Sequence, residues 1–203
     1  MRQLLRSAMT ICILVPGLAT LSHAGIVTFN FDADTTGTMT PFTDTDKGSG
    51  LSATFTSSPD AGGFTMNSIP GFFQSLTGNF LLDSAQESLT IVFSSPQASI
   101  SLDFATFDSQ ALNLSASLGA TPVGSTSATG TVPGGGFSLP EGVLNFSGGT
   151  FDTVVLSSST PNFGVDNITV NDTAAAVPEP GSFVLCGGIL AALSLARLRR
   201  RSS

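Results

Sequence analysis

Apolar and polar residues alternate over several short stretches in the central region of the chain. In "IVTFNF" (26–31) and "ASISLDFATF" (98–107), apolar residues recur at every second position over most of the stretch. A period of two is typical of β-strands that bury one face. The alternation predicts strands at 26–31, 51–56, 88–94, 98–107, 112–118, 143–148, 151–157 and 163–170. No part of the central region shows a convincing helical period with capping residues.

Turn-forming residues stand between these stretches. They are Ser58-Pro59-Asp60, Gly62-Gly63, Pro70-Gly71, Pro133 to Gly136, and Ser147-Gly148-Gly149. Short strands with Gly and Pro between them predict an all-β fold, an antiparallel β-sandwich over residues 25–170. In the last strand, Val165 and Ile168 do not keep one parity, which predicts a β-bulge near Asp166.

Phenylalanine supplies the large core side chains, because the chain has sixteen Phe and neither Trp nor Tyr. Burial of one such ring contributes roughly 1.5–3 kcal/mol. The core candidates are Phe29, Phe31, Phe55, Phe93, Phe104, Phe146, Phe151 and Phe163. Sugar-binding faces usually offer Tyr or Trp, so sugar binding here would have to rely on Phe, Asn, Asp and backbone groups.

The first 24 residues have the pattern of a secretory signal peptide. Arg2 and Arg6 precede an apolar stretch at 8–21, and Ser22-His23-Ala24 places small residues before a cleavage site. The exported chain is then expected to begin at Gly25. The alternative is an uncleaved anchor, but ~14 apolar residues are few for a bilayer.

The composition changes again after Val170. Residues 171–180 are small or polar and contain two prolines, which predicts a linker. Residues 181–196 carry no charge and predict a short transmembrane helix of about 24 Å. The basic tail 197–203 is expected to stop export on the cytoplasmic side, which leaves the body of the protein outside. The arginines of this membrane stop are Arg197, Arg199, Arg200 and Arg201.

The charge balance excludes several classes of function. Thirteen of the fourteen acids but only one base, Lys47, fall within 25–176, so this region has a net charge of −12 and nucleic-acid binding is not expected. The same region lacks His, Cys, Tyr and Arg. That excludes Ser-His-Asp and Cys-His triads, zinc sites with His or Cys ligands, and arginine clamps for phosphate.

Carboxylates remain as candidate chemistry. A pair such as Asp103 and Glu141 has the groups that a glycosidase needs. Calcium is the second use, because "DADTTG" begins like a D-x-D-x-x-G loop with Asp32 and Asp34. The twelfth position of that loop is Thr43 instead of Glu, so an EF-hand is excluded. Asp44 and Asp46 form a similar pair, and all four can also be ordinary turn residues.

Two segments resemble the jelly-roll domains of secreted bacterial proteins. "FGVDNITV" (163–170) resembles the last strand of galactose-binding-like jelly rolls, and "IVTFNFDAD" (26–34) resembles the first. In that group, acids of the first and last strands often share a structural calcium. The resemblance therefore implies a jelly roll with calcium ligands at Asp32 and Asp166, joined by Asp34.

The C-terminal segment resembles the tripartite tail of the PEP-CTERM sorting family of Gram-negative bacteria. The sorting motif is Pro178-Glu179-Pro180, followed by the apolar helix 181–196 and the arginine cluster. The resemblance implies processing by an exosortase, transient anchoring in the inner membrane, and release to the cell surface or the exopolysaccharide of a biofilm matrix. The alternative is a plain single-span anchor.

Three classes of function are consistent with these features. The first is a non-enzymatic structural or adhesive component associated with extracellular polysaccharide. The second is a specific carbohydrate-binding module, and the third is a carboxylate-dependent glycosidase. The sorting tail favours the first class, and the residues missing from 25–176 disfavour most enzymes.

Overall fold

A computed structural model of the chain describes residues 25–83, 87–159 and 162–172, which belong to one compact unit. These residues form eleven strands and no helix. The strands are β1 (Ile26–Phe29), β2 (Phe42–Thr45), β3 (Ser52–Ser58), β4 (Phe64–Asn67), β5 (Phe80–Asp83), β6 (Ser88–Thr106), β7 (Ala111–Leu118), β8 (Thr121–Thr129), β9 (Glu141–Phe146), β10 (Phe151–Ser158) and β11 (Phe163–Asp172). All pairings between them are antiparallel, so the predicted all-β class is confirmed.

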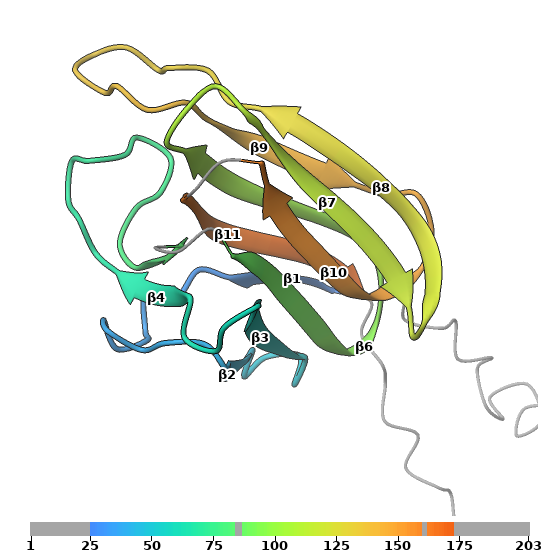
Figure 1. The fold of residues 1–203 in the computed structure, drawn as a ribbon. Helices are drawn as coiled ribbons and strands as arrows, with labels where there is room; N and C mark the ends of the chain where they lie inside the picture. The colour runs from blue at the N-terminus through green and yellow to red at the C-terminus, as the bar shows by residue number, and fades with distance from the viewer. Residues whose placement is uncertain (1–24, 84–86, 160–161, 173–203) are drawn as a thin grey trace, which may run out of the picture. The chain divides into compact units, whose positions relative to one another are not determined.

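The long strand β6 belongs to two layers (Figure 1). Its first half lies between β3 and β10, which gives the order β2-β3-β6-β10-β7-β8. Its second half lies between β9 and β11, and β1 and β5 share the other edge of β11. The buried parity of β6 changes between Gln97 and Ile100, so its inward side shifts where the strand passes from one layer to the other.

The core lies between the two layers. Phe29 of β1 packs against Phe55 of β3, with 6.4 Å between ring centroids, and Phe146 of β9 packs against Phe151 of β10 at 5.6 Å. These pairs join the layers face to face, as in a β-sandwich. The eight predicted core phenylalanines are all buried, with no more than 7% of any of them exposed. That prediction is confirmed.

Some strand boundaries differ from the predictions. The two strands expected at 88–94 and 98–107 are one strand, β6, because the polar step at Ser94–Ala98 changes the register with β10 without ending the strand. The strands β2, β4, β5 and β8 were not predicted. Three of them have only four residues, and β8 has no buried position that would produce an apolar alternation. The bulge predicted near Asp166 is confirmed by a shift of register between Asp166 and Thr169.

Several predictions concern residues outside the described ranges. These are the signal peptide 1–24, most of the linker 171–180, the helix 181–196 and the tail 197–203. The last strand extends two residues beyond the predicted domain end at Val170. Within the described part of the chain, no helix has the length and apolar character needed to cross a membrane.

Candidate functional site

One row of polar side chains crosses the outer face of the layer that contains β9, the second half of β6, β11 and β1. Asn145 of β9 lies opposite Ser101 of β6, Ser101 lies opposite Thr169 of β11, and Thr169 lies opposite Thr28 of β1. Their sequence neighbours point into the core, so these four side chains point outward. We call this set the polar row. The Thr28 and Thr169 hydroxyls are 2.9 Å apart and share a hydrogen bond.

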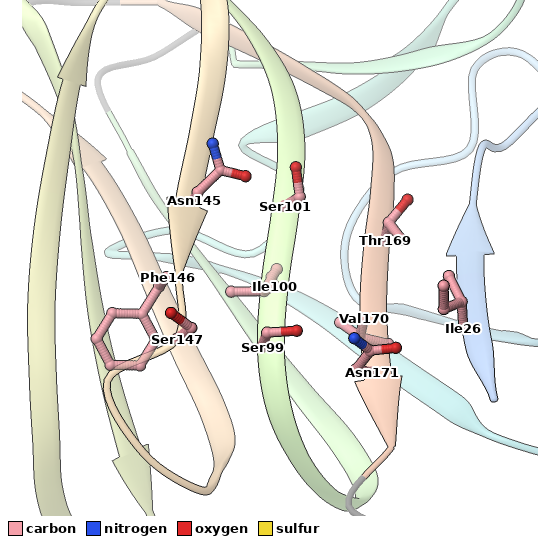
Figure 2. Close-up of a pocket in the computed structure, with 10 residues that line it drawn as sticks. All are labelled: Ile26, Ser99, Ile100, Ser101, Asn145, Phe146, Ser147, Thr169, Val170 and Asn171. Atoms are coloured by element: carbon pink, nitrogen blue, oxygen red, sulfur yellow. The ribbon is translucent and has the colours of Figure 1, made fainter. Parts of the chain in front are cut away.

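A second row lies two residues further along the same strands. Ser99 of β6 lies opposite Asn171 of β11, and Asn171 lies opposite Ile26 of β1, whose side chain is 72% exposed. The two rows, apart from Thr28, line a shallow groove of about 260 Å³ (Figure 2). Thr28 lies outside this lining and continues the polar row beyond it, through its pairing with Thr169. No residue that lines the groove is ionisable. The groove therefore offers hydroxyl and amide groups on a neutral surface.

The other end of the same face is covered by the loop 68–79, which we call the covering loop. Phe73 and Leu76 of this loop pack with Phe80 and Ala105 in a small apolar cluster. The buried Glu141 carboxylate accepts hydrogen bonds from the backbone N–H of Gln74 (2.9 Å) and from the N–H and hydroxyl of Ser75 (both 2.6 Å). A buried carboxylate is tolerated only when it is satisfied in this way. The loop is therefore fixed to the start of β9.

Three carboxylates meet at the border between the groove and the covering loop. Asp166 lies opposite Asp103, and Asp32 is close enough to interact with Asp166 electrostatically. We call Asp32, Asp103 and Asp166 the carboxylate cluster. The pKa of the Asp166 carboxyl is raised to about 7. Burial is the largest cause, the hydrogen bonds from the Asn167 and Thr77 N–H groups oppose it, and the negative charges of Asp32 and Asp103 add to it.

Backbone and side-chain donors satisfy this cluster. The N–H of Thr77 donates to Asp166 (3.1 Å), and the N–H of Asn79 donates to Asp32 (3.1 Å). The side-chain amide of Asn167 donates to Asp103 (2.9 Å). Asn167 adopts a φ of 49°, in the left-handed region that Asn tolerates better than most residues. The bulge in β11 thereby aims this amide at Asp103.

The predicted calcium ligands Asp32 and Asp166 thus accept hydrogen bonds from residues 79 and 77 of the covering loop. The third, Asp34, contributes its backbone carbonyl, which accepts a hydrogen bond from the Asn79 amide (2.8 Å). Partial burial, followed by the charge of Asp44, raises the pKa of the Asp34 carboxyl. That carboxyl therefore interacts with Asp44. Asp103 is the third member of the cluster, and sequence reasoning did not assign it to calcium.

The fit of these residues to calcium is incomplete in their present arrangement. Calcium takes about six to eight oxygen ligands, and here N–H groups of the covering loop donate to one oxygen of Asp32 and one of Asp166. Within residues 25–83, 87–159 and 162–172, no group of three His, Cys, Asp or Glu side chains is arranged to hold a metal ion. Calcium binding at Asp32, Asp34 and Asp166 therefore stays a prediction.

Asp46 behaves as a turn residue. Its carboxylate accepts hydrogen bonds from the Ser49 N–H (2.6 Å) and hydroxyl (2.7 Å), and these bonds lower its pKa. Its backbone carbonyl accepts the Gly50 N–H at 2.8 Å. These contacts close the hairpin between β2 and β3, so the turn interpretation applies to Asp46. Asp44 lies within β2.

Asp103 and Glu141 come from neighbouring strands of the same face. Asp103 lies opposite Val143, and Glu141 lies opposite Ala105, so the two acids are one row apart. Both oxygens of Glu141 already accept hydrogen bonds from the covering loop. A general acid must reach the glycosidic oxygen, and the loop lies where that substrate atom would have to be.

The groove residues Ser99, Ser101, Asn145 and Thr169 were missed by sequence reasoning. Their residue types are common in this chain and carry no chemical signature. The one signal in the sequence was their place in the alternation, since they occupy the outward positions of predicted strands. Parity alone did not show that β9, β6, β11 and β1 lie side by side, because that order depends on pairings between distant segments.

No protein-family model and no curated protein matches this chain. Among solved structures, it is similar to the K1 cleaved adhesin domain of Lys-gingipain from Porphyromonas gingivalis W83, at 10% identity, covering 73% of this chain and 98% of that one, with a TM-score of 0.41.

It is also similar to two carbohydrate-binding modules of Clostridium thermocellum. One is the family 11 module of Lic26A-Cel5E (16% identity, 74% of this chain, 96% of that one, TM-score 0.36). The other is the C-terminal family 22 module of Xyn10B (9% identity, 61% and 88%, TM-score 0.35). Similarity at this level establishes neither a ligand nor an activity for this chain.

Proposed function

We propose that the domain is a non-enzymatic polysaccharide-binding component of an exported surface or matrix protein, with a jelly-roll sandwich that binds glycan in its outer-face groove. The observation that carries the proposal is the polar row together with the second row of Ser99, Asn171 and Ile26. Together they present hydroxyl and amide groups from four adjacent strands on one neutral, open surface. Sugar hydroxyls pair with such groups without the cost of burying a charge.

The glycosidase alternative is disfavoured by the state of Glu141. Its carboxylate is 5% exposed and holds the covering loop through its hydrogen bonds. The Asp103 carboxylate accepts a hydrogen bond from the side-chain amide of Asn167. The arrangement favours a structural role for both acids. The proposal therefore assigns no catalytic residue.

For localisation, the proposal rests on the sequence of the two termini. The signal peptide 1–24 directs export, and the exosortase recognises Pro178-Glu179-Pro180 while the helix 181–196 and its arginines hold the substrate in the inner membrane. Processing releases the body of the protein into the extracellular polysaccharide of a Gram-negative bacterium. Mass spectrometry of the exported protein from cells with and without exosortase tests this part. A product of unchanged mass in both would contradict it.

Structural calcium is the remaining part of the proposal. Its support is that Asp32 and Asp166 contact one loop, through Asn79 and Thr77. The buried Asp166 carboxyl also lies near the negative charges of Asp32 and Asp103, which favours a neutralising cation at neutral pH. Calcium would compete for these carboxylates with the N–H groups of Thr77 and Asn79, or would use lone pairs that those donors leave open. Calcium in that position would fix the covering loop and would not contact the groove rows.

Affinity electrophoresis in gels that contain polysaccharide tests the binding function. The test variant is Asn145→Ala with Thr169→Ala, which removes an amide and a hydroxyl from the polar row. Its matched control is Asn113→Ala with Ser115→Ala, which removes the same two groups from the exposed positions of β7 in the other layer. The test variant should lose most of its retardation while the control keeps it. Equal retardation of both would refute the assignment to the groove.

A further inference from the structure

The dimensions and charge of the groove point to a particular class of glycan. We infer that the groove takes a neutral polysaccharide whose chain lies along the polar row, across the strands. This inference rests on the proposed function and adds the ligand class and its direction.

The direction follows from the extent of the polar surface. Across the strands, the polar row runs from Asn145 through Ser101 and Thr169 to Thr28. With neighbouring strands ~4.8 Å apart, these side chains cover about 14 Å. Successive groups are spaced by close to the length of one pyranose unit in an extended glycan. Roughly three to four sugar units can therefore each meet one group of the row.

Along the strands the polar surface is much shorter. On β6 it consists of Ser99 and Ser101, which are ~6.6 Å apart. The next outward residue is Asp103 of the carboxylate cluster, and beyond it lies the covering loop held by Glu141. A chain that followed the strands would meet a carboxylate after about one to two sugars. The longer uninterrupted neutral path is the one across the strands.

The charge class follows from the same neighbours. No residue that lines the groove is ionisable, so no cation is present there to pair with a uronic acid or a sulfate. Asp103 lies on the same strand as Ser101, one outward position away. A carboxylate on a sugar bound in the polar row would lie within several ångströms of the Asp103 carboxylate. Like charges at that distance weaken binding by roughly tenfold.

The lack of an aromatic platform sets the expected strength. The groove offers hydrogen bonds and the exposed Ile26 side chain, with no exposed ring among its lining residues. Binding through a few exposed hydrogen bonds corresponds to dissociation constants of about a millimolar for short oligosaccharides. Loss of one such bond lowers affinity by about fivefold.

The test is calorimetric titration of the purified protein with oligosaccharides. Neutral series derived from cellulose, xylan, galactan, mannan and laminarin are compared with anionic series derived from polygalacturonate and alginate. The inference predicts that at least one neutral series binds, that affinity rises with length and levels off at about four units, and that the anionic series bind roughly tenfold more weakly. Asn145→Ala and Thr28→Ala, at opposite ends of the row, should each weaken the tetrasaccharide about fivefold, and Asn113→Ala should not.

The outcomes separate the two claims. Preferential binding of an anionic series through the groove would overturn the ligand class and leave the proposed function standing. A plateau at two units, with no effect of Thr28→Ala, would overturn the direction across the strands. Binding of neither class would remove the proposed function and this inference with it.

Discussion

Asp166 makes the domain sensitive to pH. Its carboxyl is buried in β11 beside Asp103 and Asp32, and its folded-state pKa is about 7, against 3.8 for an ordinary Asp. The folded state therefore holds a proton that the unfolded state releases between about pH 4 and pH 7. The stabilising contribution of the protonated carboxyl is complete below about pH 4 and is lost as the pH rises through about 7.

The size of the effect follows from the shift in pKa. A shift from 3.8 to about 7 corresponds to about 4 kcal/mol if the site is fully shielded from solvent. Solvent screening at the border of the groove reduces this value, and we expect about 2 kcal/mol. The substitution Asp166→Asn removes the titrating group but keeps an oxygen that can accept the Thr77 N–H. The variant should therefore lack this part of the pH dependence.

Urea unfolding in the presence of a chelator measures the prediction. Between about pH 4.5 and pH 8, the unfolding free energy of the wild-type protein should fall by about 2 kcal/mol relative to that of Asp166→Asn. Asp60→Asn is the control, because the Asp60 side chain is exposed, and it should follow the wild type. A difference between wild type and Asp166→Asn that stays constant over this pH range would refute the burial argument.

Three further predictions concern the loop, the metal and catalysis. Glu141→Gln should lower the melting temperature by about 5–15 °C, because hydrogen bonds from Gln74 and Ser75 to a buried carboxylate are lost at a cost of about 2–4 kcal/mol. An unchanged melting temperature in a thermal scan would contradict the role of Glu141 in fixing the covering loop. At about pH 8, calcium should raise the melting temperature of the wild type by several degrees over that in chelator and leave Asp166→Asn unchanged, whereas no shift in the wild type would remove the calcium site. The purified protein should release no reducing sugar from any polysaccharide that it binds, and release that is abolished by Glu141→Gln without loss of stability would support the glycosidase instead.

The sequence was sufficient for the class of fold because the core follows a local rule. Phe29, Phe55 and Phe104 occupy alternate positions of short segments, and a buried face produces that pattern wherever it occurs. The bulge at Asp166 was predictable for the same reason, since it interrupts the alternation of apolar and polar positions in the last strand. The edge strand β8 was not, because none of its side chains is fully buried and its hydrophobic residues Val123 and Ala128 are only partly buried against the core, which leaves no apolar alternation.

The site was only partly predictable. The resemblance to jelly rolls implied Asp32 and Asp166 as calcium ligands, which stays a prediction. That both accept hydrogen bonds from the covering loop is known only from the structure. The place of Asp103 beside Asp166 depends on the pairing of β6 with β11, which brings together two residues 63 positions apart in the chain (166 − 103). The polar row depends on three such pairings at once. Neutral Ser, Thr and Asn carry no signal until the register of the strands is known.

Backbone amide shifts on titration with the best-bound oligosaccharide test the central claim most directly. In two-dimensional NMR spectra, binding in the groove predicts that the largest shifts cluster at Ser99, Ser101, Asn145, Thr169 and Asn171. The amide shifts of residues in β7 and β8, which lie in the other layer, should remain unchanged. Shifts concentrated in β7 and β8 or in the covering loop, with the polar row silent, would contradict the assignment of glycan binding to this groove.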